Sequence, residues 1–179
     1  MNNLTNTFDM RKYWDSYDRL HHYDHAEVLE HIKSIKGIQD YKVLDVCCGK
    51  GFFHEILIGM GIDACGLDFS KNAGLMDKSG KFIKGDMIAL PFKNNLFDIV
   101  SCMRSINYLS GEGEFMQFFR EVDRVVKKQI ILSFSNERKV TSKYIFDILK
   151  YFNFEPIQEG IKERNSDGNL YIFERSKNA

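Results

Sequence analysis

Apolar positions along the chain follow two different spacings. Short runs rich in apolar and β-branched residues predict strands at 41–46, 62–67, 81–84, 97–102, 129–134, 154–161 and 170–173. Apolar residues three and four positions apart predict helices at 24–35, 52–60, 115–126 and 141–152, with a shorter one at 71–78. Strands that alternate with helices indicate βαβ units, so we expect a doubly wound α/β domain with a mostly parallel sheet and helices on both faces.

Turn signals add detail to this fold. Residues 165–169, Asn-Ser-Asp-Gly-Asn, are typical of a hairpin turn and predict a closing hairpin that adds an antiparallel edge to the sheet. The run at 97–102 is nearly all apolar, which predicts a strand covered on both faces. Glycines at 37 and 61 end two of the predicted helices, and Thr141 or Ser142 is positioned to cap the last one.

The first forty residues differ from the rest. They predict a helical segment, residues 1–40, packed on a core domain of residues 41–179, the whole forming one globular domain. Its irregular aromatic stripe consists of Phe8, Tyr13, Trp14, Tyr17 and Leu20. Residues 24–37 read as a helix that opens with Asp24 and Glu27, an acidic pair in capping positions.

Charge and composition narrow the class of protein. Lys and Arg number 25 and so do Asp and Glu, and this zero net charge gives no general attraction for nucleic acid. The apolar runs are far shorter than the roughly 20 residues of a membrane span. The N-terminus carries neither a basic start nor an apolar stretch. We therefore expect a cytoplasmic protein with no membrane partner, and we favour a small-molecule partner over a nucleic acid.

Cysteine and histidine positions do not form a recognisable metal motif. The four cysteines at 47, 48, 65 and 102 are too few for a disulfide scaffold and lack CxxC spacing, so we interpret them as small core residues in a reducing compartment. The alternative is a soft metal or metalloid held by thiols near the strand ends, as arsenic methylation would use. His21, His22 and His25 surround Asp24, and we favour solvated side chains over metal ligands there.

The loop after the first predicted strand reads Asp45-Val46-Cys47-Cys48-Gly49-Lys50-Gly51. In doubly wound sheets ligands bind beyond the carboxyl ends of the strands, beside the first strand. Two glycines let the backbone turn and approach a ligand closely. The dinucleotide fingerprint fails because Cys47 and Phe52 occupy its first and third glycine positions, and no P-loop is present. An acid before the loop suits a cationic amine better than a pyrophosphate.

Two more acids end the next two strands. Asp68 follows Gly49 by nineteen residues, a position from which a carboxylate accepts hydrogen bonds from a ribose diol. Asp86 follows the third strand and suits the exocyclic amine of a purine, while Met87 offers an apolar contact and a backbone N–H. Together the three acids describe a site for an adenosyl amino acid.

The ordered set of motifs resembles the class I S-adenosylmethionine-dependent methyltransferases, in their small-molecule, type 11-like branch. The matching stretches are 43–51, 66–70, 82–86, 89–92 and 97–101. The resemblance implies a Rossmann-like seven-stranded sheet with an antiparallel last strand, S-adenosylmethionine as cofactor and S-adenosylhomocysteine as product. The candidate cofactor-binding residues are Asp45, Cys47, Gly49, Gly51, Asp68, Phe69, Gly85, Asp86, Met87 and Cys102.

The chain also departs from the family pattern. Cys47 and Cys48 stand where small glycines or alanines are usual, and Phe53 falls where another glycine is expected, which predicts an altered floor of the site. The segment 70–79 is short, so the second helix is trimmed. Many members carry a histidine after the fourth strand, where this chain reads Arg104-Ser105-Ile106-Asn107-Tyr108.

Methyl transfer from a sulfonium depends more on alignment and exclusion of water than on a general base. The candidate catalytic residues are Tyr13, Tyr17, Arg104 and Asn107. One hypothesis makes the N-terminal segment a lid in which Tyr13 or Tyr17 lines the acceptor pocket, and the alternative is that these aromatics only pack a helix on the sheet. Arg104 suits an acceptor carboxylate or phosphate, or else a structural ion pair.

The expected function is methyl transfer to a small-molecule acceptor. Two other classes stay open: a non-catalytic cofactor-binding or scaffold member of the fold, and an RNA or protein methyltransferase. The Asn/Asp-Pro-Pro-aromatic motif that the family uses for base amino groups is missing from this sequence. A homodimer in which a second subunit completes the pocket is also left open.

Overall fold

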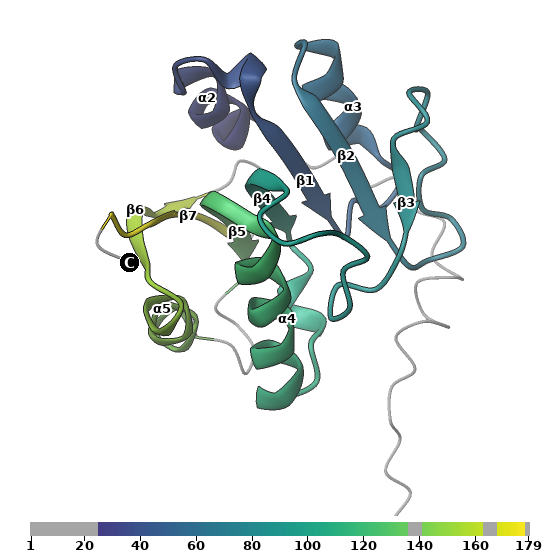
Figure 1. Ribbon diagram of the computed structural model, residues 1–179. Helices are drawn as coiled ribbons and strands as arrows, with labels where there is room; N and C mark the ends of the chain where they lie inside the picture. Colours follow the sequence, from purple (N-terminus) through teal and green to yellow (C-terminus); the bar gives the residue numbers. More distant parts are fainter. Residues whose placement is uncertain (1–24, 136–140, 163–167, 178–179) are drawn as a thin grey trace, which may run out of the picture.

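The computed structural model describes residues 25–135, 141–162 and 168–177. Seven strands form one sheet in the order β3-β2-β1-β4-β5-β7-β6 (Figure 1). Their bounds are β1 Lys42–Val46, β2 Asp63–Asp68, β3 Phe82–Lys84, β4 Phe97–Met103, β5 Val126–Phe134, β6 Phe154–Lys162 and β7 Asn169–Arg175. The neighbouring strands from β3 to β5 are parallel, and β7 runs antiparallel to β5 and β6. The predicted doubly wound α/β fold with an antiparallel last strand is confirmed.

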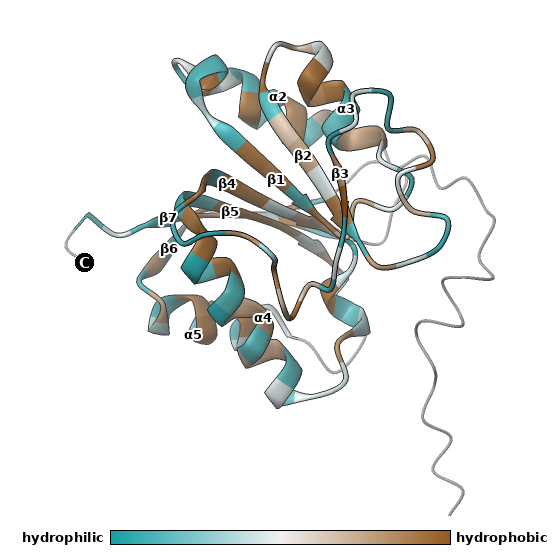
Figure 2. Ribbon diagram, turned by 45° about the vertical axis from the view of Figure 1, so that its right-hand side comes forward, coloured by the Kyte–Doolittle hydropathy of each residue, from teal (hydrophilic) through white to brown (hydrophobic). Residues whose placement is uncertain are grey.

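Helices cover both faces of this sheet. The α-helices are α2 Ala26–Ser34, α3 Phe52–Gly59, α4 Glu112–Val125 and α5 Ser142–Tyr151, with short 3₁₀ turns at Ile38–Asp40 and Ile106–Tyr108. Helices α2 and α3 lie on one side and α4 and α5 on the other (Figure 2). Successive strand residues alternate between the layers, so Val43 packs with α2 and α3 while its neighbour Leu44 belongs to the other cluster. Because β4 is covered on both faces, nearly all of its residues are apolar.

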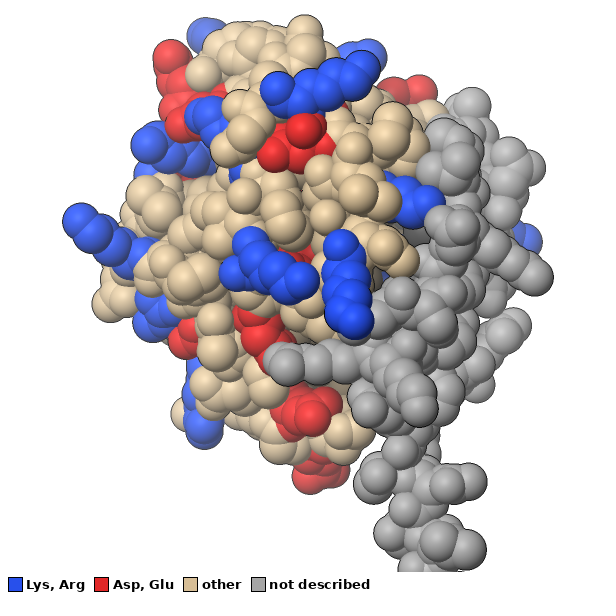
Figure 3. Space-filling model, turned by 90° about the vertical axis from the view of Figure 1, so that its right-hand side faces the viewer, with Lys and Arg blue, Asp and Glu red and all other residues tan. Residues whose placement is uncertain are grey.

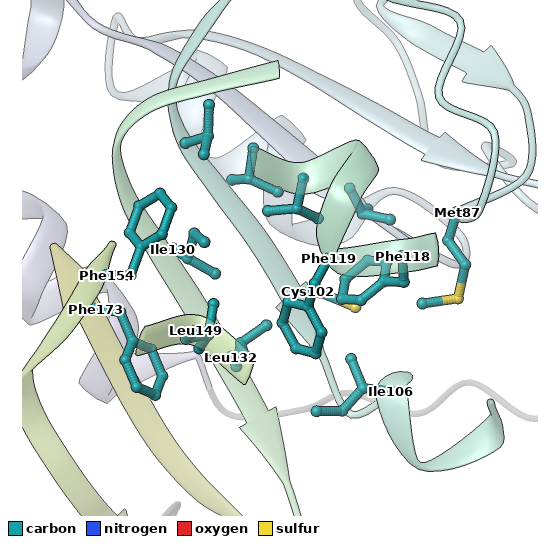
Figure 4. Close-up of a cluster of buried hydrophobic side chains, with 14 of the residues drawn as sticks. Met87, Cys102, Ile106, Phe118, Phe119, Ile130, Leu132, Leu149, Phe154 and Phe173 are labelled. Atoms are coloured by element: carbon teal, nitrogen blue, oxygen red, sulfur yellow. The ribbon is translucent and has the colours of Figure 1, made fainter. Parts of the chain in front are cut away.

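The larger cluster lies between the sheet and α4 and α5. Phe118 and Phe119 of α4 are almost completely buried against strand residues that include Cys102 and Leu132 (Figure 4). Full burial of an apolar side chain of this size contributes roughly 1.5–3 kcal/mol. The predicted cap of α5 is confirmed, because the Thr141 hydroxyl accepts a hydrogen bond from the Tyr144 backbone N–H at 3.3 Å.

The predicted helix at 71–78 is wrong. The segment between β2 and β3 consists of turns, and it contains Gly74 with φ +69°. Two of its backbone N–H groups donate to the loop after β1: that of Gly74 to the Gly49 carbonyl at 2.9 Å and that of Met76 to the Lys50 carbonyl at 2.8 Å. Its local hydrogen bonds, from Ala73 to Ser70 and from Asp77 to Gly74, form single turns and no helix.

Asp98 illustrates a polar residue in an apolar strand. It is the second residue of β4, at the end of the strand opposite the glycine loop. There it accepts the Lys42 backbone N–H and pairs with the ammonium groups of Lys127 and Lys128 at 3.1 and 3.2 Å. Burial opposes ionisation of this carboxyl, but these hydrogen bonds lower its pKa below the usual value. The interpretation of Asp98 as structural is confirmed.

Several predicted features lie outside the described residues. They are the aromatic stripe with Tyr13 and Tyr17, His21, His22 and Asp24, the loop at 136–140 and most of the last hairpin turn. Helix α2 buries Val28 and Ile32 in the same cluster as β1, and the division at residue 41 stays a prediction. Within the described part of the chain, no helix combines the length and the apolar character that a membrane span needs.

Candidate functional site

The candidate site lies where the strand order changes direction. Strands β1 and β4 are neighbours in the middle of the parallel part of the sheet. The chain after β1 leads through α3 to β2 on one side, and the chain after β4 leads through α4 to β5 on the other side. The carboxyl ends of β1, β2 and β3 meet at one edge (Figure 1). Ligands of open α/β sheets bind at such a switch point.

The loop after β1 has an unusual backbone. Cys47, Gly49 and Gly51 have φ of +58°, +54° and +95°, all in the left-handed region that favours glycine. Gly51 is the N-cap of α3, and the loop enters this helix directly. The two glycines therefore allow the chain to reverse within a few residues, while Cys47 adopts the same region at a steric cost.

Asp68 joins this loop to β2. Its Oδ2 accepts the Gly49 backbone N–H at 3.0 Å and its Oδ1 accepts that of Ser70 at 2.8 Å. The side chain is largely buried, and the Cys48 N–H donates to the Leu67 carbonyl beside it. Each carboxylate oxygen has a second lone pair, so the fixed carboxylate can still accept hydrogen bonds from a diol.

The end of β3 contacts the same structure. The Gly85 backbone N–H donates to the Asp68 carbonyl at 3.0 Å. Asp86 Oδ1 accepts the Ile88 N–H at 3.2 Å in a tight turn, and Met87 Sδ lies 3.5 Å from Cys47 Sγ. The three strand ends are thus linked to one another. Phe69, half-buried, follows Asp68 directly.

Asp45 is the most buried of the three acids. Only 2% of its surface is exposed, and the Ser101 hydroxyl donates to its Oδ1 at 3.2 Å. Burial raises the pKa of Asp45 to about 8; the Ser101 hydrogen bond lowers it, and the nearby negative charge of Asp68 raises it again. The carboxyl group is therefore protonated at neutral pH unless a cation approaches it.

Two thiols lie between these elements. A contact with the Cys102 thiol, followed by burial, raises the pKa of Cys47 well above its usual value, so Cys47 is a neutral thiol. Cys102 has no exposed surface. Its thiol contacts that of Cys47 in the loop after β1, and the predicted contact of Cys102 with the cofactor stays a prediction.

Arg104 and Asn107 follow β4. Arg104 has φ +60°, and its backbone N–H donates to the Ser133 carbonyl at 2.8 Å. The Asn107 amide bonds the Ser135 backbone twice, donating from Nδ2 at 2.9 Å and accepting at Oδ1 at 3.3 Å. These bonds join the segment after β4 to the end of β5, and the catalytic roles of Arg104 and Asn107 stay predictions.

Sequence reasoning missed or misplaced some residues. Phe53 was expected in the floor of the site, yet it packs in the core against α2, with its ring centroid 4.8 Å from that of His25. Ser101 was missed because it contacts Asp45 from a strand distant in sequence. Glu121 and Arg124 were also missed. Glu121 accepts the Leu90 N–H and Arg124 donates to the Phe92 carbonyl, so they fix the segment after Asp86.

Comparisons with solved structures agree with this architecture. The magnesium protoporphyrin IX methyltransferase of Synechocystis PCC 6803, solved with bound S-adenosylmethionine, superposes with a TM-score of 0.71 at 18% identity, over 84% of this chain and 77% of that one. A likeness at this identity shows the fold. The predicted Rossmann-like architecture is thereby confirmed a second time.

The relatives found by sequence are longer than the region that matches this chain. An uncharacterized protein of Methanocaldococcus jannaschii is 30% identical over 87% of this chain and 62% of its own length. Demethylmenaquinone methyltransferase of Lactococcus lactis is 30% identical over 57% of this chain and 43% of its own. The chain spans less than two thirds of the curated relatives it matches.

A family model covers the region that carries the site. Residues 44–134 match the methyltransferase domain, from β1 through β5, and include the glycine loop, Asp68 and Asp86. This match takes in more than half of the chain. The chain therefore belongs to the methyltransferase domain family.

Proposed function

We propose that the chain binds S-adenosylmethionine at the joined ends of β1, β2 and β3 and transfers its methyl group to a small-molecule acceptor. The observation that carries the proposal is the hydrogen-bonded link of Gly49 and Gly85 to Asp68, beside the turn of Asp86. A structural neighbour solved with S-adenosylmethionine and S-adenosylhomocysteine supports it.

The residues divide among the parts of the cofactor. Asp68, held by two backbone N–H groups, accepts hydrogen bonds from the ribose hydroxyls. Asp86 accepts from the adenine amine, and Met87 contacts the ring. The backbone of Gly49 and Gly51 comes close to the amino acid part, since a side chain would obstruct it. The cofactor supplies an activated methyl group on a sulfonium, and the chain aligns it and excludes water.

Asp45 responds to the charge of the cofactor. Its pKa of about 8 means that the carboxyl carries a proton near neutral pH. A nearby ammonium group favours the ionised carboxylate, so cofactor binding releases this proton. Asp45 thus contributes to binding through a charge that forms only in the complex.

A small-molecule acceptor fits the surface better than a nucleic acid. The net charge is zero. Lys and Arg side chains are spread over the face in Figure 3 among acidic and neutral ones. A demethylmenaquinone methyltransferase and a magnesium protoporphyrin IX methyltransferase are among the similar proteins. On the acceptor side, Arg104, Tyr13 and Tyr17 stay candidate contacts, as does a second subunit.

Transfer of a labelled methyl group tests the function. The chain is incubated with methyl-labelled S-adenosylmethionine and a panel of small molecules that includes quinols, carboxylic acids and amines. We expect label in one chemical class of product, with an equal amount of S-adenosylhomocysteine. Folded protein that binds the cofactor but labels no small molecule, while labelling RNA or a protein, would contradict the proposed acceptor class.

A further inference from the structure

A buried histidine lies directly behind the glycine loop. His54, on α3, has no exposed surface, and its ring packs so closely on Gly51 and Gly66 that a Cβ there would lie 2.7 and 2.4 Å from its atoms. Among the residues that the structure describes, neither ring nitrogen has a hydrogen-bond partner. A buried polar group without a hydrogen bond lowers the stability of the fold by about 1–3 kcal/mol, and native proteins seldom contain one. The imidazole of His54 is therefore a candidate to bind a ligand.

Two carboxyl side chains lie beside this ring. His54 Nε2 is 3.5 Å from Asp77 Oδ1, and one oxygen of Glu55 completes a set of three atoms that lie within 4.8 Å of one another. A cation placed among these three atoms would be attracted by both carboxyl groups.

Backbone groups hold both carboxylates in place. Glu55 Oε1 accepts the N–H groups of Lys78 and Ser79, both at 3.1 Å, and Asp77 Oδ2 accepts that of Phe82 at 3.0 Å. The Ser79 hydroxyl donates to Asp77 Oδ1 at 2.7 Å. Both carboxyl side chains are therefore held in place by hydrogen bonds from the segment between β2 and β3.

We propose that His54, Glu55 and Asp77 bind one divalent transition-metal ion, with Zn²⁺ as the best match. Imidazole nitrogen and carboxylate oxygen are both zinc ligands, and three protein ligands leave the fourth tetrahedral position for water. Magnesium and calcium prefer all-oxygen ligands, so the imidazole disfavours them. The two carboxylates balance the charge of the ion.

The site has a structural consequence for the cofactor loop. Asp77 belongs to the segment between β2 and β3, whose Gly74 and Met76 N–H groups bind the carbonyls of Gly49 and Lys50. A bound metal joins this segment to α3 and stabilises the loop from behind. None of the three ligands is among the proposed cofactor contacts, so metal binding and cofactor binding can be measured separately.

Zinc titration of the full chain after treatment with a chelator tests the proposal. We expect one Zn²⁺ per chain in competition with a chromophoric chelator, the visible absorption of four-coordinate Co²⁺ on substitution, and a higher melting temperature with Zn²⁺. Glu55→Gln keeps the oxygen that accepts the backbone bonds but removes the charge. It should weaken Zn²⁺ binding by at least about 100-fold and abolish the thermal shift.

Controls separate this site from others. Glu155→Gln is the same substitution at an exposed residue of β6, and it should leave Zn²⁺ affinity unchanged. Asp77→Asn provides a second test if Glu55→Gln fails to fold. Wild-type protein that binds no Zn²⁺ would overturn the proposal and leave His54 and Asp77 as an ion pair. Equal binding by wild type and both variants would also overturn it, since the ion would then lie elsewhere, as at His21 and His22.

Discussion

Asp45 is an ionisable group in a position where the packing of the sheet favours an apolar side chain. Its hydrogen bond from Ser101 satisfies one oxygen, but the surroundings still disfavour a charge there. Groups with strongly shifted pKa values concentrate at functional sites. The stability lost by burying Asp45 is consistent with a carboxyl group that ionises only when a cation binds. Asp68 differs from Asp45 in its hydrogen bonds, because two backbone N–H groups donate to its carboxylate.

Replacement of Asp45 by Asn should change how stability depends on pH. The folded-state pKa of about 8 lies above the unfolded value near 3.8, so the unfolded chain binds fewer protons between these values and stability falls as pH rises from about 4 to 8. Asp45→Asn removes this loss, and its stabilising effect should grow across that window to about 3–6 kcal/mol at pH 8. Urea unfolding at pH 4, 6 and 8 measures it. A difference independent of pH would show that Asp45 titrates normally.

Gly66 is predicted to tolerate no side chain. A Cβ at this position would lie 2.4 Å from His54 Nδ1 and 2.7 Å from Cys48 Sγ, both in closely packed surroundings. Gly66→Ala should lower the free energy of unfolding by ~1–3 kcal/mol. Gly59→Ala, at the end of α3 with open space around it, is the matched control and should leave stability unchanged or raise it by up to ~1 kcal/mol. Equal effects of the two substitutions would refute the packing argument.

At the scale of elements, the segments around the site depend on contacts from other parts of the chain. Arg124 of α4 donates to the carbonyls of Leu90 and Phe92 and to the side chain of Glu121, and Glu121 also accepts the Leu90 N–H. This pair fixes the connection from β3 to β4 that contains Asp86 and Met87. The failed helix prediction at 71–78 has the same origin, because local periodicity cannot report bonds made to a distant loop.

Removal of the Arg124 side chain should loosen this connection. Arg124→Ala leaves partly buried carbonyls without donors, so the free energy of unfolding should fall by ~1–3 kcal/mol. Affinity for S-adenosylhomocysteine should fall by up to roughly tenfold, since Met87 and Asp86 are less well positioned. Arg120→Ala, an exposed position one turn earlier on α4, should change neither quantity. Denaturant unfolding and calorimetry provide the two numbers, and equal losses from both variants would contradict a specific role for Arg124.

For the whole molecule, the sequence predicted the fold well because its two hydrophobic periods report burial directly. The strand-end acids Asp45, Asp68 and Asp86 were identified from their spacing, and the structure links the ends of their strands. Side-chain partners distant in sequence could not be predicted: Ser101 reaches Asp45, and Asn107 bonds Ser135. His54 was missed because it reads as an ordinary member of an amphipathic helix, and only the fold brings Asp77 to it.

Binding of S-adenosylhomocysteine to wild type, Asp68→Ala and Asp63→Asn tests the central claim most directly. Asp63 begins the strand that Asp68 ends, and its exposed ion pairs with Lys42 and Lys81 contribute little. By calorimetry, wild type should bind one molecule per chain, Asp68→Ala should bind about 10–100-fold more weakly, and Asp63→Asn should bind like wild type. Folded wild type without binding, or Asp68→Ala with unchanged affinity, would contradict a cofactor site at the joined ends of β1, β2 and β3.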